Sequence, residues 1–300
     1  MPLKIGILSG HEVFTNSLIE EINKKGRGEV TAEFCQIKET KVFEPSGYRV
    51  IIDRISHCVD YYRTYLKNAA LSGTYVINNP FWFSADDKFY NYALATKLGI
   101  AIPKTLCLPS KEYSEDLEEG DLKNLVYPLN WREIAEYIGF PSVLKPYDGY
   151  GWRDVFKVDN MEELQEAYDE SGEQVMVLQE FIKFEHYVRV FAIGKKYILP
   201  IKYDPLQRKY MIDHKHLSDE LGKRIVEDSI KINEALGYDM NTIEFAIREG
   251  VPYAIDFMNP VPEAKPYVIT EGYFKWVVEH LAKVAIEYAL SGATTPFRLS

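Results

Sequence analysis

Residues 241–259 read Asn241-Thr-Ile-Glu244-Phe-Ala-Ile-Arg-Glu-Gly250-Val-Pro-Tyr-Ala-Ile-Asp256-Phe-Met-Asn259, and this stretch decides the fold. Apolar side chains alternate with polar or small ones before and after Gly250, which is the period-two pattern of two half-buried strands. If Glu249-Gly250-Val251 is a three-residue loop, with glycine free to take a positive φ, the strands pair as a hairpin. That register places Glu244 directly opposite Asp256.

The two opposed carboxylates need a neutralising partner, because like charges that face each other across a ladder are destabilising. A divalent cation such as Mg²⁺ would supply it, since hard cations prefer carboxylate oxygens and often complete their shell with substrate phosphates. Asn259 adds a neutral oxygen nearby. The alternative is a solvated outer face on which Arg248 or Lys265 balances the charge. From the hairpin alone, both interpretations stay open.

The composition is that of a globular protein with room for two or three domains. The chain has 300 residues, of which 46% are hydrophobic and 27% charged. Its formal net charge of −10 argues against a nucleic-acid partner. There is no signal-peptide pattern and no run long enough to span a membrane, so we expect a cytoplasmic protein without a membrane partner. Cys35, Cys58 and Cys107 lie far apart, as reduced structural thiols do.

Strand and helix patterns alternate over the first 80 residues, which predicts a small α/β domain with a largely parallel sheet. We expect strands at 3–8, 30–37, 48–55 and 75–78, and helices at 13–25 and 60–70. No GxGxxG follows the first strand, which weakens a dinucleotide-binding interpretation. Ser9-Gly10-His11 could still lie at the carboxyl end of a strand, where such sheets bind ligands.

A helix is expected to follow this domain. Residues 78–84 have the composition of a linker, and Ser84 is a plausible N-cap for a helix over 85–98. Lys88 falls in its first turn, where the helix dipole disfavours a cation. Lys88 is therefore either an ordinary exposed lysine or a lysine that projects toward an anion.

The middle of the chain contains a glycine loop between two strands. Residues 110–125 are acidic and predict a surface excursion. Residues 141–158 then predict strand, loop and strand, with Lys145 on the first strand and Gly149-Tyr150-Gly151 in the loop. Such a loop lets backbone amides approach a phosphate closely, although a plain tight turn is the simpler alternative.

Further elements complete the chain. A strand over 175–182 ends in the polar pair Gln179-Glu180, and a hairpin over 187–201 carries Arg189 and turns at Gly194. Amphipathic helices are predicted at 225–236 and 273–290, the latter with an apolar face typical of a core helix.

In this order, the motifs resemble those of the ATP-grasp superfamily, most closely its glutathione-synthetase and RimK-type carboxylate–amine ligases. The resemblance covers about residues 50 to 290 and depends on six features in sequence. They are Asp53-Arg54-Ile-Ser56; Asp87-Lys88 ahead of Gly-Ile-Ala-Ile-Pro103; Val-Leu-Lys145-Pro with Gly149-Tyr150-Gly151; Leu-Gln179-Glu180-Phe-Ile182; Val188-Arg189-Val with Ile193-Gly194; and Glu244 with Asp256 and Asn259.

The resemblance implies an α/β fold in three parts. These are an N-terminal parallel α/β domain over 1–85, a linker helix with the central subdomain over 86–183, and a C-terminal subdomain over 184–300. ATP would be sandwiched between two antiparallel sheets of the last two parts.

The resemblance also implies roles for individual residues. ATP phosphates would contact Lys88 and Lys145 beneath a lid that contains Gly149 and Gly151. The adenine edge would be held by Glu180 and the backbone of Phe181 and Ile182, next to Gln179, and the ribose by Glu185. One or two Mg²⁺ ions, or Mn²⁺, would be coordinated by Glu244, Asp256 and Asn259. The catalytic cations would be Arg189, Lys145 and Lys202.

The implied reaction joins a carboxylate to an amine, or less often a thiol, through an acyl phosphate, and releases ADP and phosphate. An amino acid or peptide is the expected substrate, and a homodimer is the expected assembly. Two alternatives stay open: an ATP-binding regulatory module without ligase activity, and an ATP-dependent kinase of the same fold.

Three points depart from the pattern or are not settled by it. Asp256-Phe-Met-Asn259 carries one residue more than the usual acid-x-Asn, so Asn259 would need a bulge or a strand end to face the metal. Lys202 stands where RimK-type ligases carry an arginine. A substrate carboxylate could dock at Arg54, Ser56 and His57, and His214 and His216 lie in a polar loop; ordinary capping or surface roles are the alternative for all of these.

Overall fold

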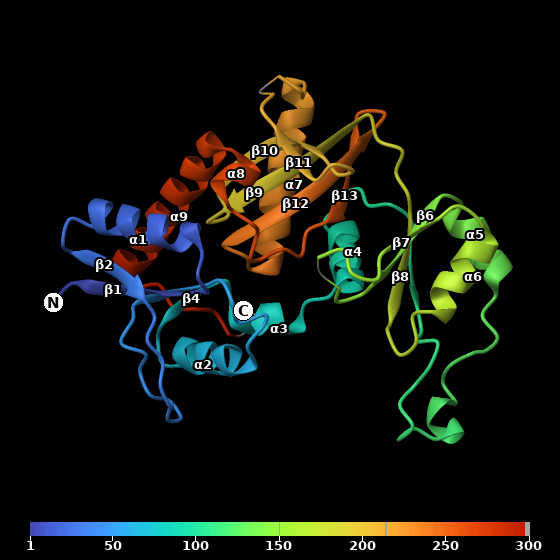
Figure 1. The fold of residues 1–300 in the computed structure, drawn as a ribbon, viewed down its shortest axis with the longest axis horizontal. Helices are drawn as coiled ribbons and strands as arrows, with labels where there is room; N and C mark the ends of the chain where they lie inside the picture. The colour runs from blue at the N-terminus through green and yellow to red at the C-terminus, as the bar shows by residue number, and fades with distance from the viewer. Residues whose placement is uncertain (150, 214, 298–300) are drawn as a thin grey trace. The chain divides into compact units, whose positions relative to one another are not determined.

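The computed structural model describes residues 1–149, 151–213 and 215–297, and its ribbon is drawn in Figure 1. Tyr150 and His214 therefore lie outside the described residues. The chain divides into two compact units. The first comprises residues 1–85, 186–245 and the chain from 257 onward, and the second comprises residues 86–185 and 246–256. The predicted division into three consecutive parts stays a prediction.

The N-terminal part of the first unit is built on a parallel sheet in the order β2-β1-β3-β4. Its strands are β1 (Leu3–Leu8), β2 (Val30–Phe34), β3 (Val50–Asp53) and β4 (Tyr75–Ile77), and its helices are α1 (Val13–Lys25), α2 (Asp60–Leu71) and α3 (Pro80–Ala85). The predicted α/β domain is confirmed. Strand β2 ends at Phe34 and not at residue 37 as expected. Phe34 pairs with Ile7, and β1 ends at the next residue, Leu8, so β1 offers no partner strand beyond this point.

The expected linker at 78–84 is wrong, because it contains α3. Ser84 is not an N-cap: its hydroxyl donates to the carbonyl of Pro80 inside that helix. The next helix, α4 (Lys88–Lys97), is capped by Asp87, whose carboxylate accepts from the amide of Tyr90 at 2.7 Å. Lys88 is thus the first residue of its helix.

The remainder of the first unit contains most of an antiparallel sheet with helices against it; residues 246–256 of this sheet belong to the second unit. This sheet has the order β11-β10-β9-β12-β13. The strands are β9 (His186–Ile193), β10 (Tyr197–Asp204), β11 (Lys209–Met211), β12 (Met240–Arg248) and β13 (Val251–Asp256), and the helices are α7 (Asp219–Leu236), α8 (Pro266–Ile269) and α9 (Glu271–Ser291). As predicted, the β9–β10 hairpin turns at Gly194, where a Cβ atom would lie only 2.5 Å from the side chain of Val284.

The second unit has its own antiparallel sheet, in the order β5-β8-β6-β7. Its strands are β5 (Thr105–Leu108), β6 (Ser142–Pro146), β7 (Phe156–Val158) and β8 (Met176–Glu180), and its helices are α4, α5 (Trp131–Ile138), α6 (Met161–Asp169) and the 3₁₀ helix η1 (Glu119–Leu122). Figure 1 shows α5 and α6 beside this sheet, where Leu144, Leu164 and Leu178 form the centre of the core. The two antiparallel sheets agree with the predicted fold class.

The turn between β12 and β13 differs from the expected three-residue loop. It contains only Glu249 and Gly250, with φ of 53° and 72°, which is the geometry of a tight hairpin turn with two left-handed residues. The predicted pairing of Glu244 with Asp256 assumed a loop that is one residue longer. With the shorter turn, that pairing no longer follows from the loop length. That expectation about the loop was wrong.

The chain leaves the strand directly after Asp256. In the first unit, the carbonyl of Asn259 accepts from the amide of Thr242 at 3.2 Å, and the side chain of Asn241 bonds to the backbone of Phe257 and Asn259 at 2.8 and 3.0 Å. The additional residue between Asp256 and Asn259 is therefore accommodated beyond the end of β13.

Candidate active site

Lys88 is a buried cation at the start of α4. Its amide donates to the carbonyl of Tyr147 at 2.8 Å, and its Nζ lies 3.1 and 3.3 Å from the two carboxylate oxygens of Asp256. The N-terminus of a helix repels an ammonium group, and burial removes its hydration, so the carboxylate offsets both costs. Lys88 is not the ordinary exposed lysine of the simpler interpretation.

Lys145, on β6, is the second buried cation of this unit. Its Nζ lies 2.7 Å from the hydroxyl of Tyr92, 3.0 Å from Oε1 of Gln179 and 3.4 Å from the carbonyl of Ile255. The amide of Gln179 is oriented in turn by its Nε2, which donates to the hydroxyl of Thr105 at 3.0 Å. These acceptors are neutral, so they fix the ammonium group without cancelling its charge.

Two consecutive residues of β13 hold these two lysines. The carbonyl of Ile255 accepts from Lys145 and the carboxylate of Asp256 accepts from Lys88. The second unit thus brings together Lys88, Lys145, Gln179 and Asp256, four of the predicted site residues. The ammonium groups of Lys88 and Lys145 thus lie at consecutive residues of one strand, and ammonium groups attract anions such as a phosphate.

The carboxylate of Glu180, at the end of β8, accepts a hydrogen bond from another side chain of its unit. Arg248 donates to its Oε1 at 2.7 Å, and this hydrogen bond is the main reason that the pKa of Arg248 is raised. Arg248 therefore pairs with Glu180, and not with Glu244 or Asp256 as the alternative interpretation proposed. The amide of Phe181 donates to the carbonyl of Pro141 at 3.1 Å. The predicted contacts of Phe181 and Ile182 with adenine stay predictions. Glu185 is exposed and accepts from the amide of Glu249.

The glycine loop needs its glycines. At Gly149 a Cβ atom would lie 3.0 Å from the side chain of Pro146, and Gly151 has a φ of 70°, which side chains disfavour. Trp152 follows with a φ of 63° and is largely exposed. The predicted roles of Gly149 and Gly151 as part of a lid stay predictions.

Arg189 lies in the first unit, on β9, between two aromatic rings. Its guanidinium carbon is 5.3 Å from the ring centre of Tyr203 and 5.7 Å from that of Tyr210, and its Nε is 3.4 Å from Oε1 of Glu244. Tyr187 donates to the other oxygen of Glu244 at 2.5 Å. Burial raises the pKa of Tyr203 and of Tyr210, so both rings stay neutral and attract the cation.

Lys202, on β10, forms a small polar group with the loop that follows β11. Its Nζ donates to Asp213 at 2.9 Å, and this bond is the main reason that the pKa of Asp213 is lowered. His216 contacts the carbonyl of Asp213 through Nδ1 at 2.5 Å, and burial lowers the pKa of His216. The ammonium group of Lys202 is therefore held by Asp213, and the catalytic role of Lys202 stays a prediction.

Arg54 is held by contacts within its own unit, and the substrate-docking role considered for it stays a prediction. Its guanidinium donates to both oxygens of Glu12, at 2.9 and 3.2 Å, and to the carbonyl of Pro262 at 3.1 Å. It also lies over the ring of Phe14. The hydroxyl of Ser56 donates to Asp53 in the turn after β3. The sequence could not show this, because Glu12 is 42 positions from Arg54.

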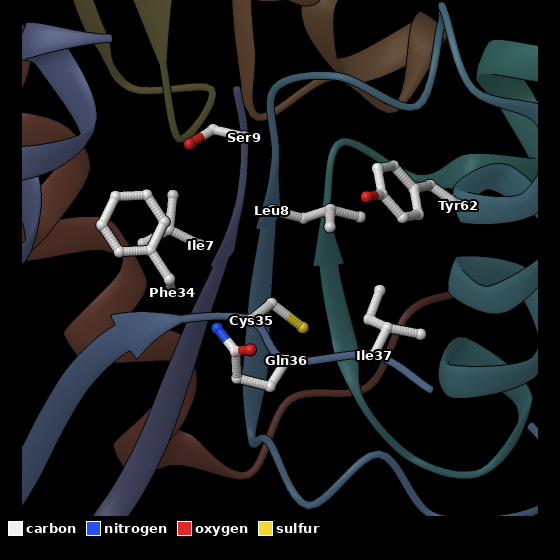
Figure 2. Close-up of a pocket in the computed structure, with 8 residues that line it drawn as sticks. All are labelled: Ile7, Leu8, Ser9, Phe34, Cys35, Gln36, Ile37 and Tyr62. Atoms are coloured by element: carbon white, nitrogen blue, oxygen red, sulfur yellow. The ribbon is translucent and has the colours of Figure 1, made fainter. Parts of the chain in front are cut away.

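A hollow of about 310 Å³ opens at the carboxyl ends of β1 and β2, and Figure 2 shows its lining. It is formed by residues 7–9, residues 34–37 and Tyr62. None of these side chains is charged, and Ser9, Gln36 and Tyr62 are the polar ones among them. Burial raises the pKa of Cys35 to about 11, which keeps this thiol protonated at neutral pH.

The predicted metal ligands supply only oxygen donors, which is the donor set that Mg²⁺ prefers. Within the described ranges, no group of three or more His, Cys, Asp or Glu side chains is placed to hold a metal ion. Glu244 and Asp256 each lie next to a cation of their own unit, Arg189 and Lys88 respectively. Coordination by Glu244, Asp256 and Asn259 stays a prediction.

Among the helices of the described chain, none is long and apolar enough to cross a membrane.

Solved structures with the same fold are found over nearly the whole chain. D-alanine–D-alanine ligase from Bacillus anthracis, complexed with ATP, matches with a TM-score of 0.65 and 18% identity over 96% of this chain and 97% of that one. The RimK domain ATP-grasp protein from Sphaerobacter thermophilus matches with a TM-score of 0.66 and 18% identity over 96% and 99%. The chain has the ATP-grasp fold. This confirms the predicted fold class.

The sequence relatives of this chain are distant. The alpha-aminoadipate–LysW ligase LysX of Sulfolobus acidocaldarius is 25% identical over 194 residues, which are 61% of this chain and 64% of that protein. Human mitochondrial pyruvate carboxylase is 30% identical over 144 residues, 41% of this chain and 12% of that protein. The chain thus spans less than two thirds of either relative. No family model matches it.

Proposed function

We propose that this ATP-grasp protein is an enzyme, an ATP-dependent ligase that joins a carboxylate to an amine. The observation that carries the proposal is the pair of buried lysines, Lys88 and Lys145, held on consecutive residues of β13. An ATP-grasp fold supplies the context, because the structural neighbours named above include ligases and one of them is complexed with ATP. ATP is accordingly the proposed cofactor.

The chemistry suits the residue types at the site. Phosphoryl transfer depends on positioning and on neutralising charge, and needs no nucleophilic side chain. Lys88 and Lys145 would hold the phosphates, and an incoming triphosphate would compete with Asp256 for Lys88. Glu244, Asp256 and Asn259 would hold Mg²⁺, or Mn²⁺, which neutralises phosphate charge when bound. Arg189, oriented by Glu244, would face the charge on the transferring phosphoryl group.

In the proposed reaction, a substrate carboxylate oxygen attacks the γ-phosphorus of ATP and the bond to ADP breaks. The amine then attacks the acyl carbon, phosphate leaves with the electron pair of the broken bond, and the amine proton passes to solvent. Lys202 would attract the negative substrate end. The proposed substrates are an amino acid or a peptide and an amine. A cytoplasmic location and a homodimer remain expectations from the sequence.

ADP release tests this proposal directly. The full chain is incubated with ATP, Mg²⁺ and pools of amino acids and dipeptides, and joined products are sought by mass spectrometry. We expect ADP and a joined product in equal amounts. Lys145→Met should abolish ADP release, whereas Lys223→Met should not, because Lys223 is exposed and pairs with Glu227 one turn along α7.

Two results would contradict the ligase proposal. Turnover of ATP without a joined product would indicate a kinase that stops at a phosphorylated product. ATP binding without turnover in any pool would indicate a regulatory nucleotide-binding module.

A further inference from the structure

Tyr92 lies next to Lys145, although none of the sequence motifs above includes Tyr92. It is on α4, one turn after Lys88, and is almost completely buried, with 2% of its surface exposed. Its hydroxyl is 2.7 Å from Nζ of Lys145 and 2.6 Å from the carbonyl of Ile255. The ring centre is 5.3 Å from the same ammonium group, within the range of a cation–π contact.

The hydrogen-bond directions at this hydroxyl are fixed by what its neighbours can do. The carbonyl of Ile255, at 2.6 Å, and Oε1 of Gln179, at 3.5 Å, can both only accept, and the single hydroxyl hydrogen of Tyr92 goes to the much nearer Ile255. An ammonium group only donates, so Lys145 donates to a lone pair of Tyr92. The phenol therefore connects the charged tip of Lys145 to the backbone of β13.

Such a connection matters for a lysine more than for most side chains. A lysine stem has four rotatable bonds and loses considerable entropy when its tip is held in one place. Tyr92, Gln179 and Ile255 provide three acceptors from a helix and two strands, so the position of Nζ is set by rigid elements. If one acceptor is removed, the ammonium group of Lys145 becomes more mobile and lies less often where it can contact the phosphate.

We propose that Tyr92 is a positioning residue that holds the ammonium group of Lys145 for a phosphate of ATP. The inference rests on the proposed function, because it takes Lys145 as a phosphate ligand. Tyr92 itself touches no reacting atom in this scheme. Its effect on ATP must therefore pass through Lys145, and this sets it apart from a residue that only fills the core.

The test measures binding of Mg²⁺–ATP and of adenosine to the full chain by isothermal titration calorimetry. Tyr92→Phe keeps the ring and removes the hydroxyl. We expect it to weaken ATP binding about tenfold, the usual effect of losing a hydrogen bond to a charged group, and to leave adenosine binding unchanged. Tyr90→Phe is the matched control, because Tyr90 lies on the same helix and is substantially exposed; it should bind both ligands as the wild type does.

A double-mutant comparison separates positioning from packing. In a Lys145→Met background, Tyr92→Phe should weaken ATP binding by less than about twofold, since the group it positions is gone. An additional tenfold loss in that background would overturn the proposal, as would an equal loss for ATP and adenosine. If Tyr92→Phe does not fold, Tyr92→Leu removes the same acceptor with a smaller apolar side chain and should again weaken ATP binding selectively.

The results also distinguish this inference from the proposed function. Wild-type ATP affinity in Tyr92→Phe, together with weakened binding in Lys145→Met, would overturn the role of Tyr92 alone. Wild-type affinity in Lys145→Met would overturn the assignment of Lys145 as a phosphate ligand. A wild-type chain that binds no ATP would overturn both proposals.

Discussion

Lys88 and Asp256 form an ion pair with Nζ 3.1 Å from Oδ2, although 168 positions separate them in the chain. The lysine side chain is 7% exposed and the carboxylate side chain 39% exposed. The lysine therefore bears most of the desolvation cost, and the carboxylate reaches solvent, where an incoming ligand could also meet it.

The first prediction concerns this ion pair. Asp256→Asn should lower the free energy of unfolding by about 2 kcal/mol, because it leaves a buried ammonium group without its counter-charge while the partial exposure of Asp256 moderates the loss. Urea unfolding followed by tryptophan fluorescence measures it. Asp169→Asn is the control: its pair with Lys111 is exposed and should contribute no more than about 1 kcal/mol. Equal losses would show that burial of Lys88 is not what makes the pair matter.

A second prediction concerns Asp239, which is 1% exposed. Its carboxylate accepts from the hydroxyls of Tyr75 and Tyr288, at 2.7 and 2.8 Å, and Nζ of Lys195 lies 3.3 Å away. Asp239→Asn should cost about 3 kcal/mol, since the amide cannot accept on both sides, whereas Tyr288→Phe should cost about 1 kcal/mol. Thermal unfolding of both variants checks this order. A smaller loss for Asp239→Asn than for Tyr288→Phe would refute the account.

A third prediction tests the orientation of Arg189. Glu244→Gln keeps the shape of the side chain but removes the charge that attracts the guanidinium group. We expect turnover at saturating ATP to fall at least about tenfold when it is measured well below the unfolding midpoint, which should itself fall because the largely buried Arg189 loses the opposite charge of Glu244. Glu263→Gln should leave turnover unchanged, because its pair with Lys265 is half exposed. Unchanged turnover in Glu244→Gln would remove Glu244 from the proposed site.

The fourth prediction is a pH dependence of stability. Burial lowers the pKa of His57 and of His216. A lowered pKa means that the unfolded chain binds more protons than the folded one, so stability is full above the unfolded pKa of about 6.5 and falls as pH drops through it. We expect the urea midpoint to decrease from about pH 8 to about pH 5, and His57→Gln to reduce that decrease. His11→Gln, an exposed control, should follow the wild type; a flat wild-type profile would contradict the prediction.

Local patterns predicted the elements well where one face alone is buried. The helix expected at 13–25 is α1 with the same bounds, because Phe14, Leu18 and Ile22 repeat at helical spacing and lie in the core. The C-terminal helix likewise buries the predicted apolar face. Glycine was equally informative at position 194, where the turn leaves no room for a side chain.

Local patterns could not decide which of two neighbouring residues caps a helix, or how many residues a turn contains. Ser84 and Asp87 are both good N-caps, and only the formation of α3 decides that Asp87 caps α4. A two-residue turn at 249–250 requires a left-handed Glu249, which sequence rules rank below a glycine in that position. One residue of difference in a turn changes the register of every pair that follows.

By itself, the sequence determined the order of strands, helices and motifs, and through them the ATP-grasp architecture, because hydrophobic period and turn residues act over a few neighbours. Only the tertiary structure decided which charges meet. It paired Lys88 with Asp256, Glu180 with Arg248 and Arg54 with Glu12, since a buried charge takes whichever opposite charge the folded chain brings within reach, however far away it lies in the sequence.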